Sequence, residues 1–420
     1  INESVRRMLR AKLLLGLRER EKIEISLQEA KKALDSPEDR ELSREIARKS
    51  IVLLKNGGVL PLKKDSGTIA VIGPNANSTR NLHGDYSYTA HVASEEDAVE
   101  TISVLEGIKN KVSANTKVLY AQGCDLLDTS CDGFQEALEL AEQSEVIIAV
   151  MGENSGLFKN SISGEGSDRV DLDLPGVQRE LLQALKETGK PIVLVLVNGR
   201  PLSITWEKDN ISAILETWYP GEEGGNAIAD VIFGDCNPGG KLPISFPRSV
   251  GQIPVYYNRK PSSFSEYINT DTQALFPFGH GLSYTEFSYS DLKITPSQVN
   301  SLEEVKISFK VKNTGSREGD EVVQLYIHDR VASVERPVKE LKGFKRLTLQ
   351  PGEEKEVIFT LFPEQLAFYD EFMRLIVEPG VFEVMIGSSS EDIRLSGEFE
   401  VLKEKVITKY RKFSSEVIVS

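Results

Sequence analysis

Short apolar runs alternate with helical segments through the first half of the chain. The runs are rich in β-branched residues, which is typical of buried strands, and the segments between them repeat their apolar residues with helical spacing. The expected strands cover residues 69–72, 117–120, 146–150, 191–197 and 213–218, and the expected helices cover 133–144, 174–187 and 221–233. Strands spaced by helices indicate a mainly parallel sheet covered on both faces, which is a three-layer α/β sandwich.

From residue 292 onward the period of the pattern changes to two. Apolar and polar residues alternate in short segments separated by turn residues, at 305–311, 321–327, 341–349, 356–361 and 380–387. Strands at this spacing without helices indicate an all-β sandwich of the immunoglobulin or fibronectin type. Because no Cys-Trp-Cys pattern is present, the fibronectin III-like form is favoured.

The chain opens with an amphipathic helix, expected over residues 3–20. Its apolar stripe consists of Val5, Leu9, Leu13, Leu14 and Leu17. No earlier element of this sequence can pack on the stripe, so we expect it to present apolar surface. A second helix begins at Ser36-Pro37, a cap followed by proline, and is expected to end near Asn56.

These patterns predict five parts. They are a helical linker (1–48), an α/β sandwich domain (49–250), an inter-domain connection (251–289), a fibronectin III-like domain (290–402) and a C-terminal tail (403–420). The tail is expected to be either a last strand or a disordered end.

Composition narrows the classes of partner. The 420 residues carry a formal net charge of −14, which favours neither nucleic acid nor an anionic membrane as a partner. No run approaches the ~20 apolar residues that span a bilayer. Three cysteines and four histidines show no metal-ligand spacing, so we expect neither a metal nor a cofactor. The sequence starts at Ile1 without a signal peptide, which leaves cytoplasmic and secreted locations open.

A glycine-punctuated loop at 151–169 carries the candidate chemistry. It follows the expected strand 146–150, and α/β sheets bind ligands where their strands end. The loop holds Glu153, Glu165 and Asp168, and glycines flank Glu165 on both sides. A loop with acids but no phosphate-binding pattern suits a carboxyl group that transfers protons. A solvated surface loop without function is the alternative reading of these residues alone.

Several segments together resemble the glycoside hydrolase family 3 enzymes, which include β-glucosidases and β-xylosidases. The resemblance covers nearly the whole chain in family order. Its motifs are ARKSIVLLKNGGVLPL (47–62), VIGPNA (71–76), SGEGSDRVDLDLPGVQ (163–178), VLVNGRPLSI (195–204), WYPGEEGGNAIADVIFGDCNPGGKLPISFP (218–247), FPFGHGLSYTEFSYSDL (276–292) and RPVKELKGFKRLTLQPGE (336–353).

The resemblance implies that the two catalytic residues lie on different domains. Family members of this type have an N-terminal barrel, an α/β sandwich and a fibronectin-like domain, and this chain resembles the last two. The family's nucleophile is an aspartate in a Ser-Asp-Trp-like motif on the barrel, and this sequence contains no such motif. The general acid/base is a glutamate in a stretch that Glu165 matches, with Glu153 as the runner-up.

The same resemblance suggests substrate contacts. Tyr86 and Tyr88 lie where family members often place an aromatic residue beside the aglycone, and a buried structural tyrosine is the alternative for each. Arg169 is a candidate substrate-binding residue, and an Asp168–Arg169 salt bridge that shapes the loop is its alternative. His280 is interpreted as structural, at the join between domains, and Trp206 and Trp218 are interpreted as core residues.

The sequence therefore predicts the C-terminal portion of a retaining exo-β-glycosidase, either a β-xylosidase or a β-glucosidase. Its expected partners are a β-glycoside or oligosaccharide substrate and the missing N-terminal barrel. The alternative function is a non-catalytic module that binds carbohydrate or protein.

Overall fold

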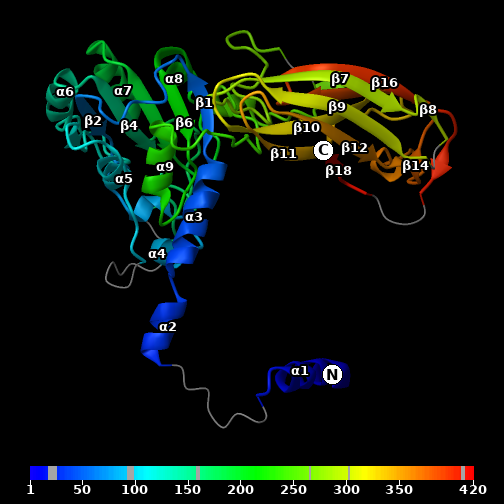
Figure 1. Cartoon of the computed structure of the whole chain (residues 1–420), viewed down its shortest axis with the longest axis horizontal. Helices are drawn as coiled ribbons and strands as arrows, with labels where there is room; N and C mark the ends of the chain where they lie inside the picture. Colours follow the sequence, from blue (N-terminus) through cyan, green and yellow to red (C-terminus); the bar gives the residue numbers. More distant parts are fainter. Residues whose placement is uncertain (18–25, 92–98, 158–160, 264–265, 301–302, 408–411) are drawn as a thin grey trace. The chain divides into compact units, whose positions relative to one another are not determined.

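The computed structural model describes residues 1–17, 26–91, 99–157, 161–263, 266–300, 303–407 and 412–420 (Figure 1). They divide into two compact units, 1–42 and 43–420. The described α-helices are α1 (Asn2–Leu14), α2 (Leu27–Ala33), α3 (Pro37–Ser50), α4 (Tyr88–His91), α5 (Val104–Lys111), α6 (Phe134–Glu142), α7 (Gln178–Glu187), α8 (Thr205–Asn210) and α9 (Gly224–Ile232).

The first sheet has six strands, in the order β1-β6-β5-β4-β2-β3. They are β1 (Val52–Asn56), β2 (Thr68–Ile72), β3 (Lys117–Ala121), β4 (Val146–Gly152), β5 (Ile192–Val197) and β6 (Ala213–Glu216). All neighbours run parallel except β1, which lies antiparallel to β6. The expected mainly parallel sheet is confirmed.

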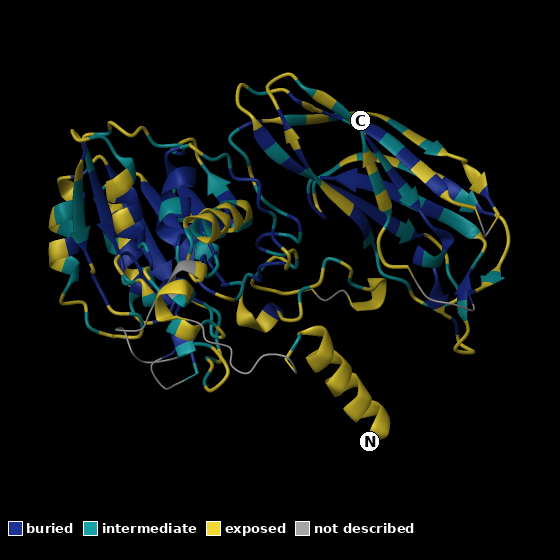
Figure 2. Cartoon of the chain, turned by 60° about the horizontal axis from the view of Figure 1, so that its bottom comes forward, coloured by how far each residue is buried: buried dark blue, intermediate teal, exposed yellow. Residues whose placement is uncertain are grey.

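Helices cover both faces of this sheet. Successive side chains of β4 alternate between two apolar cores, with Ile147 in one and Ile148 in the other. The first core includes residues of α6 and α7, with Trp206 of α8 packed against it, and the second includes residues of α3, α5 and α9. Figure 2 shows the strands as buried and the outer helix faces as exposed. The three-layer α/β sandwich is therefore confirmed.

The first strand corrects the expected end of the preceding helix. The helix was expected to run to Asn56, but α3 ends at Ser50 and β1 begins at Val52. The side chains of Val52 and Leu53 are fully buried beside β6. Pairing with a central strand thus overrides the helical pattern, because it buries a continuous apolar run that a surface helix would leave half exposed.

The second half forms an all-β sandwich. A five-stranded sheet has the order β11-β10-β15-β16-β8, a four-stranded sheet has the order β18-β12-β9-β7, and a small sheet has the order β13-β14-β17. Their bounds are β7 (Phe287–Thr295), β8 (Gln298–Val299), β9 (Val305–Asn313), β10 (Gly319–Asp329), β11 (Glu340–Leu349), β12 (Glu354–Leu361), β13 (Phe368–Tyr369), β14 (Leu375–Val377), β15 (Gly380–Gly387), β16 (Ile393–Val401), β17 (Lys405–Val406) and β18 (Glu416–Val419).

The sandwich core consists of inward-facing residues from both large sheets. Burial alternates along β9, as the period-two pattern requires. The expected domain boundary at residue 290 falls inside β7, which begins at Phe287. The tail 403–420 contributes β18, which pairs with β12, so its reading as a last strand is confirmed.

The first helix is exposed along its length. No residue of α1 is buried, and Leu9 and Leu13 are both more than half exposed. The expected apolar surface is confirmed, although α1 ends at Leu14, and residues 18–25 lie outside the described part. No described helix is both long and apolar enough to cross a membrane.

A buried aspartate attaches α3 to α9. Asp230 of α9 is 1% exposed and accepts hydrogen bonds from Arg44 Nε at 2.7 Å and Arg48 Nε at 2.6 Å. It also pairs with Lys111 of α5. Burial alone would raise the pKa of Asp230, but the hydrogen bonds from its three cationic partners lower the pKa to about 2.

This cluster predicts a stability contribution that acid removes. Because the folded-state pKa of Asp230 lies below the value of an unfolded aspartate, the contribution is present above about pH 4 and disappears toward pH 2. We expect the stability gap between the parent chain and Asp230→Asn to shrink by about 1 kcal/mol between pH 6 and pH 3, half of a total of about 2 kcal/mol. Urea unfolding followed by tryptophan fluorescence measures it, and a gap independent of pH would contradict it.

Candidate active site

The candidate site lies where the parallel strands end. Strands β2, β4 and β5 are neighbours in the sheet, so the loops that follow them meet at its carboxyl edge. The loop after β4 (153–177) carries Glu153, Glu165 and Arg169, and the loop after β2 (73–91) carries Tyr86 and Tyr88. The loop after β5 adds Arg200, which the sequence analysis did not single out.

Local hydrogen bonds shape the loop after β4. The Asn154 side chain accepts the Ile162 N–H at 2.9 Å, and Gly156 N–H donates to the Ser163 carbonyl at 3.1 Å. Gly164 has a φ of +138°, and a Cβ there would lie 2.3 Å from the Gly156 carbonyl oxygen. The sequence expectation that a glycine beside Glu165 adopts a conformation other residues avoid is confirmed at Gly164.

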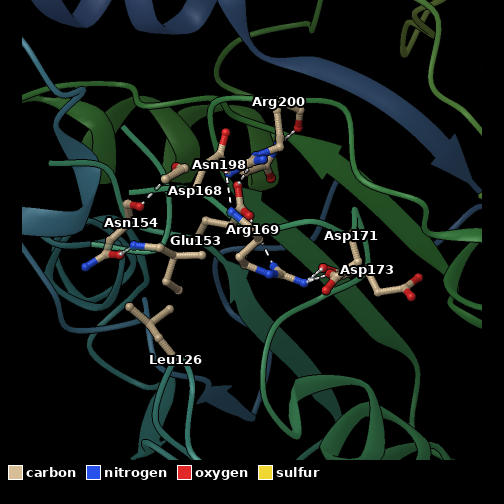
Figure 3. A network of polar contacts seen from close by, with 12 residues as sticks. Leu126, Glu153, Asn154, Asp168, Arg169, Asp171, Asp173, Asn198 and Arg200 are labelled. Carbon is tan, nitrogen blue, oxygen red and sulfur yellow. Dashed lines mark hydrogen bonds and ion pairs between the residues drawn. The ribbon is translucent and has the colours of Figure 1, made fainter. Parts of the chain in front are cut away.

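Glu153 is a buried acid held between two arginines. Its side chain is 0% exposed, and its carboxylate oxygens lie 3.2 Å from Arg169 Nη1 and 3.2 Å from Arg200 Nε (Figure 3). Its N–H donates to the Val197 carbonyl at the end of β5. Burial raises the pKa of Glu153, and the charges of Arg200 and Arg169 oppose this rise.

The two arginines extend the network to the rest of the loop. Arg169 also pairs with Asp171 and donates to the Asp173 carbonyl at 2.8 Å (Figure 3). Asp168 pairs with Arg200, and its contact with Arg169 is made by the backbone N–H of Arg169, which donates to the Asp168 carboxylate at 2.7 Å. The expected Asp168–Arg169 side-chain salt bridge is therefore replaced by two bridges that link each residue to a different partner.

Glu165 belongs to a different set of contacts. Its side chain is exposed, while its backbone N–H donates to Asp85 Oδ2 at 2.7 Å. Asp85 lies in the loop after β2, so this bond joins the two loops. Of the two candidate acids, the structure thus leaves Glu165 accessible and encloses Glu153.

The two tyrosines lie on the loop after β2, which includes α4. Tyr86 is 83% exposed and Tyr88 is 58% exposed. The negative charge of Glu165 and a hydrogen bond to its side chain raise the pKa of Tyr86. The alternative of buried structural tyrosines is wrong for both, and the structure brings Tyr86 together with Glu165.

A second buried acid was missed by the sequence analysis. Glu216 ends β6, is fully buried, and accepts hydrogen bonds from Trp218 N–H at 2.9 Å and Asn198 Nδ2 at 3.1 Å. Burial raises its pKa to about 8. An acid directly after the apolar run Ala213–Leu215 was the available signal.

The remaining singled-out residues are structural. Burial lowers the pKa of His280 to about 4, and its Nε2 lies 2.9 Å from the Leu54 carbonyl oxygen of β1. Trp206 and Trp218 pack against the first apolar core. No group of three His, Cys, Asp or Glu side chains within the described residues has an arrangement that could hold a metal ion. The acidic side chains at this edge of the sheet could therefore donate or accept a proton.

Family comparison decides the identity of the chain. The family model described as the glycosyl hydrolase family 3 C-terminal domain matches residues 51–284, and the fibronectin type III-like domain matches residues 321–390. The chain belongs to glycosyl hydrolase family 3. Its α/β sandwich is thus the family 3 C-terminal domain, followed by a fibronectin-like domain.

Named relatives of this family 3 chain are glycosidases. It is 44% identical to a β-xylosidase of Formosa agariphila, over 93% of this chain and 54% of that protein. It is 46% identical to a periplasmic β-glucosidase of Salmonella typhimurium, over 86% of this chain and 50% of that protein. The chain therefore spans about half the length of these relatives.

Solved structures show the same fold. A β-glucosidase of Listeria innocua in complex with glucose superposes with a TM-score of 0.83 at 34% identity, covering 94% of this chain and 54% of that one. A β-glucosidase involved in saponin metabolism from intestinal bacteria gives a TM-score of 0.85 at 32% identity, covering 95% and 59%.

The buried position of Glu153 predicts a structural effect of its replacement. Glu153→Gln leaves two partly buried arginines short of one carboxylate, so we expect a loss of about 3 kcal/mol in the free energy of unfolding. The value is at the low end of the range for a broken buried pair because Asp171 and Asp168 remain. Urea unfolding followed by the fluorescence of Trp206 and Trp218 measures it.

Asp171→Asn is the matched control, because Asp171 pairs with the same Arg169 but is 46% exposed. We expect this exposed partner to contribute less than about 1 kcal/mol. Equal losses in the free energy of unfolding for the two variants would show that Glu153 stabilises the loop no more than the exposed Asp171 does.

Proposed function

We propose that this chain is the C-terminal portion of a retaining exo-β-glycosidase and that Glu165 is its general acid/base. The supporting observation is the contrast between the two acids of one loop. A general acid must come within hydrogen-bond reach of the oxygen that it protonates. Glu165 is exposed and tethered through its backbone, whereas Glu153 is fully buried and both its oxygens are engaged by arginines.

The reaction divides between this chain and a barrel. In the first step, a carboxylate nucleophile on the barrel attacks the anomeric carbon while Glu165 gives its proton to the departing glycosidic oxygen. In the second step, ionised Glu165 takes a proton from water, and that water displaces the nucleophile and releases the sugar. Glu165 ends the cycle protonated, as it began.

The proposed substrates are β-xylosides or β-glucosides, the sugars that the two relatives' names specify. Tyr86 and Tyr88 offer exposed aromatic surface for the substrate near Glu165. Arg169 is proposed to serve substrate binding indirectly, since its guanidinium is already engaged by Glu153, Asp171 and the Asp173 carbonyl. The comparisons offer no support for the alternative of a non-catalytic binding module.

Because the proposed nucleophile lies on the barrel and the proposed acid/base lies on this chain, we predict that the 420-residue chain alone is inactive. Without a barrel nucleophile, we expect no hydrolysis of p-nitrophenyl β-xyloside or β-glucoside above the rate of a heat-denatured sample. Clear turnover by the purified chain would contradict the proposal and would place a nucleophilic carboxylate within it, with Asp85 and Glu153 as the first to test.

In an enzyme that contains the barrel and this chain, the role of Glu165 predicts a dependence on the leaving group. For Glu165→Gln, kcat/KM for alkyl glycosides should fall by about 10²–10⁴-fold, the usual contribution of acid assistance. Dinitrophenyl glycosides should be nearly unaffected, because dinitrophenolate departs without a proton. Azide should restore turnover of the dinitrophenyl substrate by Glu165→Ala, because azide needs no general base.

Glu142→Gln is the control for this experiment. Glu142 is an exposed glutamate at the end of α6, and the chain enters β4 directly after it, so it lies at the opposite edge of the sheet. If Glu165→Gln slows both substrates equally, or if Glu153→Gln shows the leaving-group dependence instead, the assignment of Glu165 is wrong.

A further inference from the structure

We propose that Asp85 is a positioning residue for Glu165, an inference that rests on the proposed role of Glu165 as acid/base. Asp85 Oδ2 accepts the backbone N–H of Glu165 at 2.7 Å. The Asp85 side chain is only 11% exposed. A charged acceptor at this distance makes a stronger hydrogen bond than a neutral one, and partial burial strengthens it further. The bond therefore fixes the backbone that carries the acid.

The second carboxylate oxygen of Asp85 is unusual. Oδ1 is buried and has no hydrogen-bond partner among the residues that the structure describes. His91 Nδ1 lies 3.7 Å from Oδ1, and the same nitrogen lies 2.8 Å from the Asp85 backbone oxygen. An incompletely paired buried carboxylate is costly, and such groups are rare enough to require an explanation. A role in holding Glu165 supplies one.

The opposing loop is shaped to receive Asp85. A Cβ at Gly164 would lie 2.9 Å from Asp85 Oδ2, in addition to its closer contact with the Gly156 carbonyl oxygen. Only a residue without a side chain allows the loop after β4 to approach Asp85 so closely. The neighbour of Asp85, Tyr86, interacts with the Glu165 carboxyl group itself. The loop after β2 thus contacts both the backbone and the side chain of the proposed acid.

We call the hydrogen bond from the Glu165 N–H to Asp85 the tether. Its loss should displace the proposed acid and slow the hydrolysis of substrates whose leaving group needs a proton. A displacement of about 1 Å in a reacting group can reduce the rate by ~10²-fold. In the barrel-containing enzyme, we expect Asp85→Ala to lower kcat/KM for alkyl glycosides by about 10–100-fold. The value for dinitrophenyl glycosides should stay within about 3-fold, because they need no proton. Asp85→Asn, which keeps a neutral acceptor, should fall between Asp85→Ala and the parent.

A double variant separates positioning from direct contact with substrate. If Asp85 acts only through Glu165, Asp85→Ala should cause no further loss in a Glu165→Ala background. Additive losses, or equal slowing of both substrate classes by Asp85→Ala, would overturn the inference, because either result requires a role that does not pass through Glu165.

Amide hydrogen exchange tests the tether without reference to catalysis. In the 420-residue chain, Asp85→Ala should speed exchange at the Glu165 amide by about 10-fold or more, the equivalent of one charge-assisted hydrogen bond. Glu335→Gln is the matched control, because Glu335 likewise accepts a backbone N–H from a distant segment, that of Ser262 at 2.6 Å. It should leave the Glu165 amide unchanged.

The two experiments fail in different ways. Unchanged exchange in both Asp85→Ala and Asp85→Asn overturns the tether whatever Glu165 does. If Asp85→Ala speeds exchange at the Glu165 amide but the Glu165 variants show no leaving-group dependence, the hydrogen bond is real and the catalytic role of Glu165 is refuted. In that case Asp85 does not position a general acid.

Discussion

A buried carboxylate between two arginines organises the carboxyl edge of the α/β sheet. Glu153 joins the end of β4 to Arg200 after β5 and to Arg169 farther along its own loop. Each arginine continues to an aspartate of that loop. Because unpaired charges are poorly tolerated at this depth, the four side chains around Glu153 must keep their arrangement together. These ion pairs therefore hold the loop next to the end of β4, and we call the paired side chains of Glu153, Arg169 and Arg200 the rigid base of the loop.

This rigid base separates two acids that look alike in the sequence. Glu153 follows β4 directly and is enclosed by Arg169 and Arg200. Glu165 lies farther along the same loop, on a part that faces solvent. Pairs of carboxyl groups in contrasting environments are how proteins assign different roles to the same chemistry. Here one acid is buried between two arginines, and the other is exposed to solvent.

The layers of the fold were readable from the sequence because apolar periodicity directly reflects burial. The runs at β4 and β5 are buried on both sides and could belong only to a central strand. Residues 52–56 were misread because a short buried run beside a helix has no period of its own, and only pairing with β6 reveals its state. Helix α5 was missed for a different reason: its close contact with α9 depends on Gly107 and Gly225, and glycine disfavours a helix when local propensity alone is considered.

The candidate acid was also accessible from the sequence, but its neighbours were not. Glu165 stood out through its flanking glycines and its motif. Arg200 and Asp85 come from other loops, and their partners are set by strand order, which brings β2 and β5 to either side of β4. Pairwise contacts between distant loops leave no trace in local patterns. The opposite environments of Glu153 and Glu165 likewise required the three-dimensional arrangement.

The last strand has a consequence for self-association. Strand β18 is the edge of the four-stranded sheet and pairs with β12 over Val357–Thr360. Without it, the backbone donors and acceptors of a long strand would be open to another copy of the chain. A tag, cleavage or truncation that detaches residues 416–419 would therefore promote edge-to-edge aggregation before it disturbed either apolar core of the α/β sandwich. The short terminal strand therefore covers the edge of the sheet that β12 would otherwise expose.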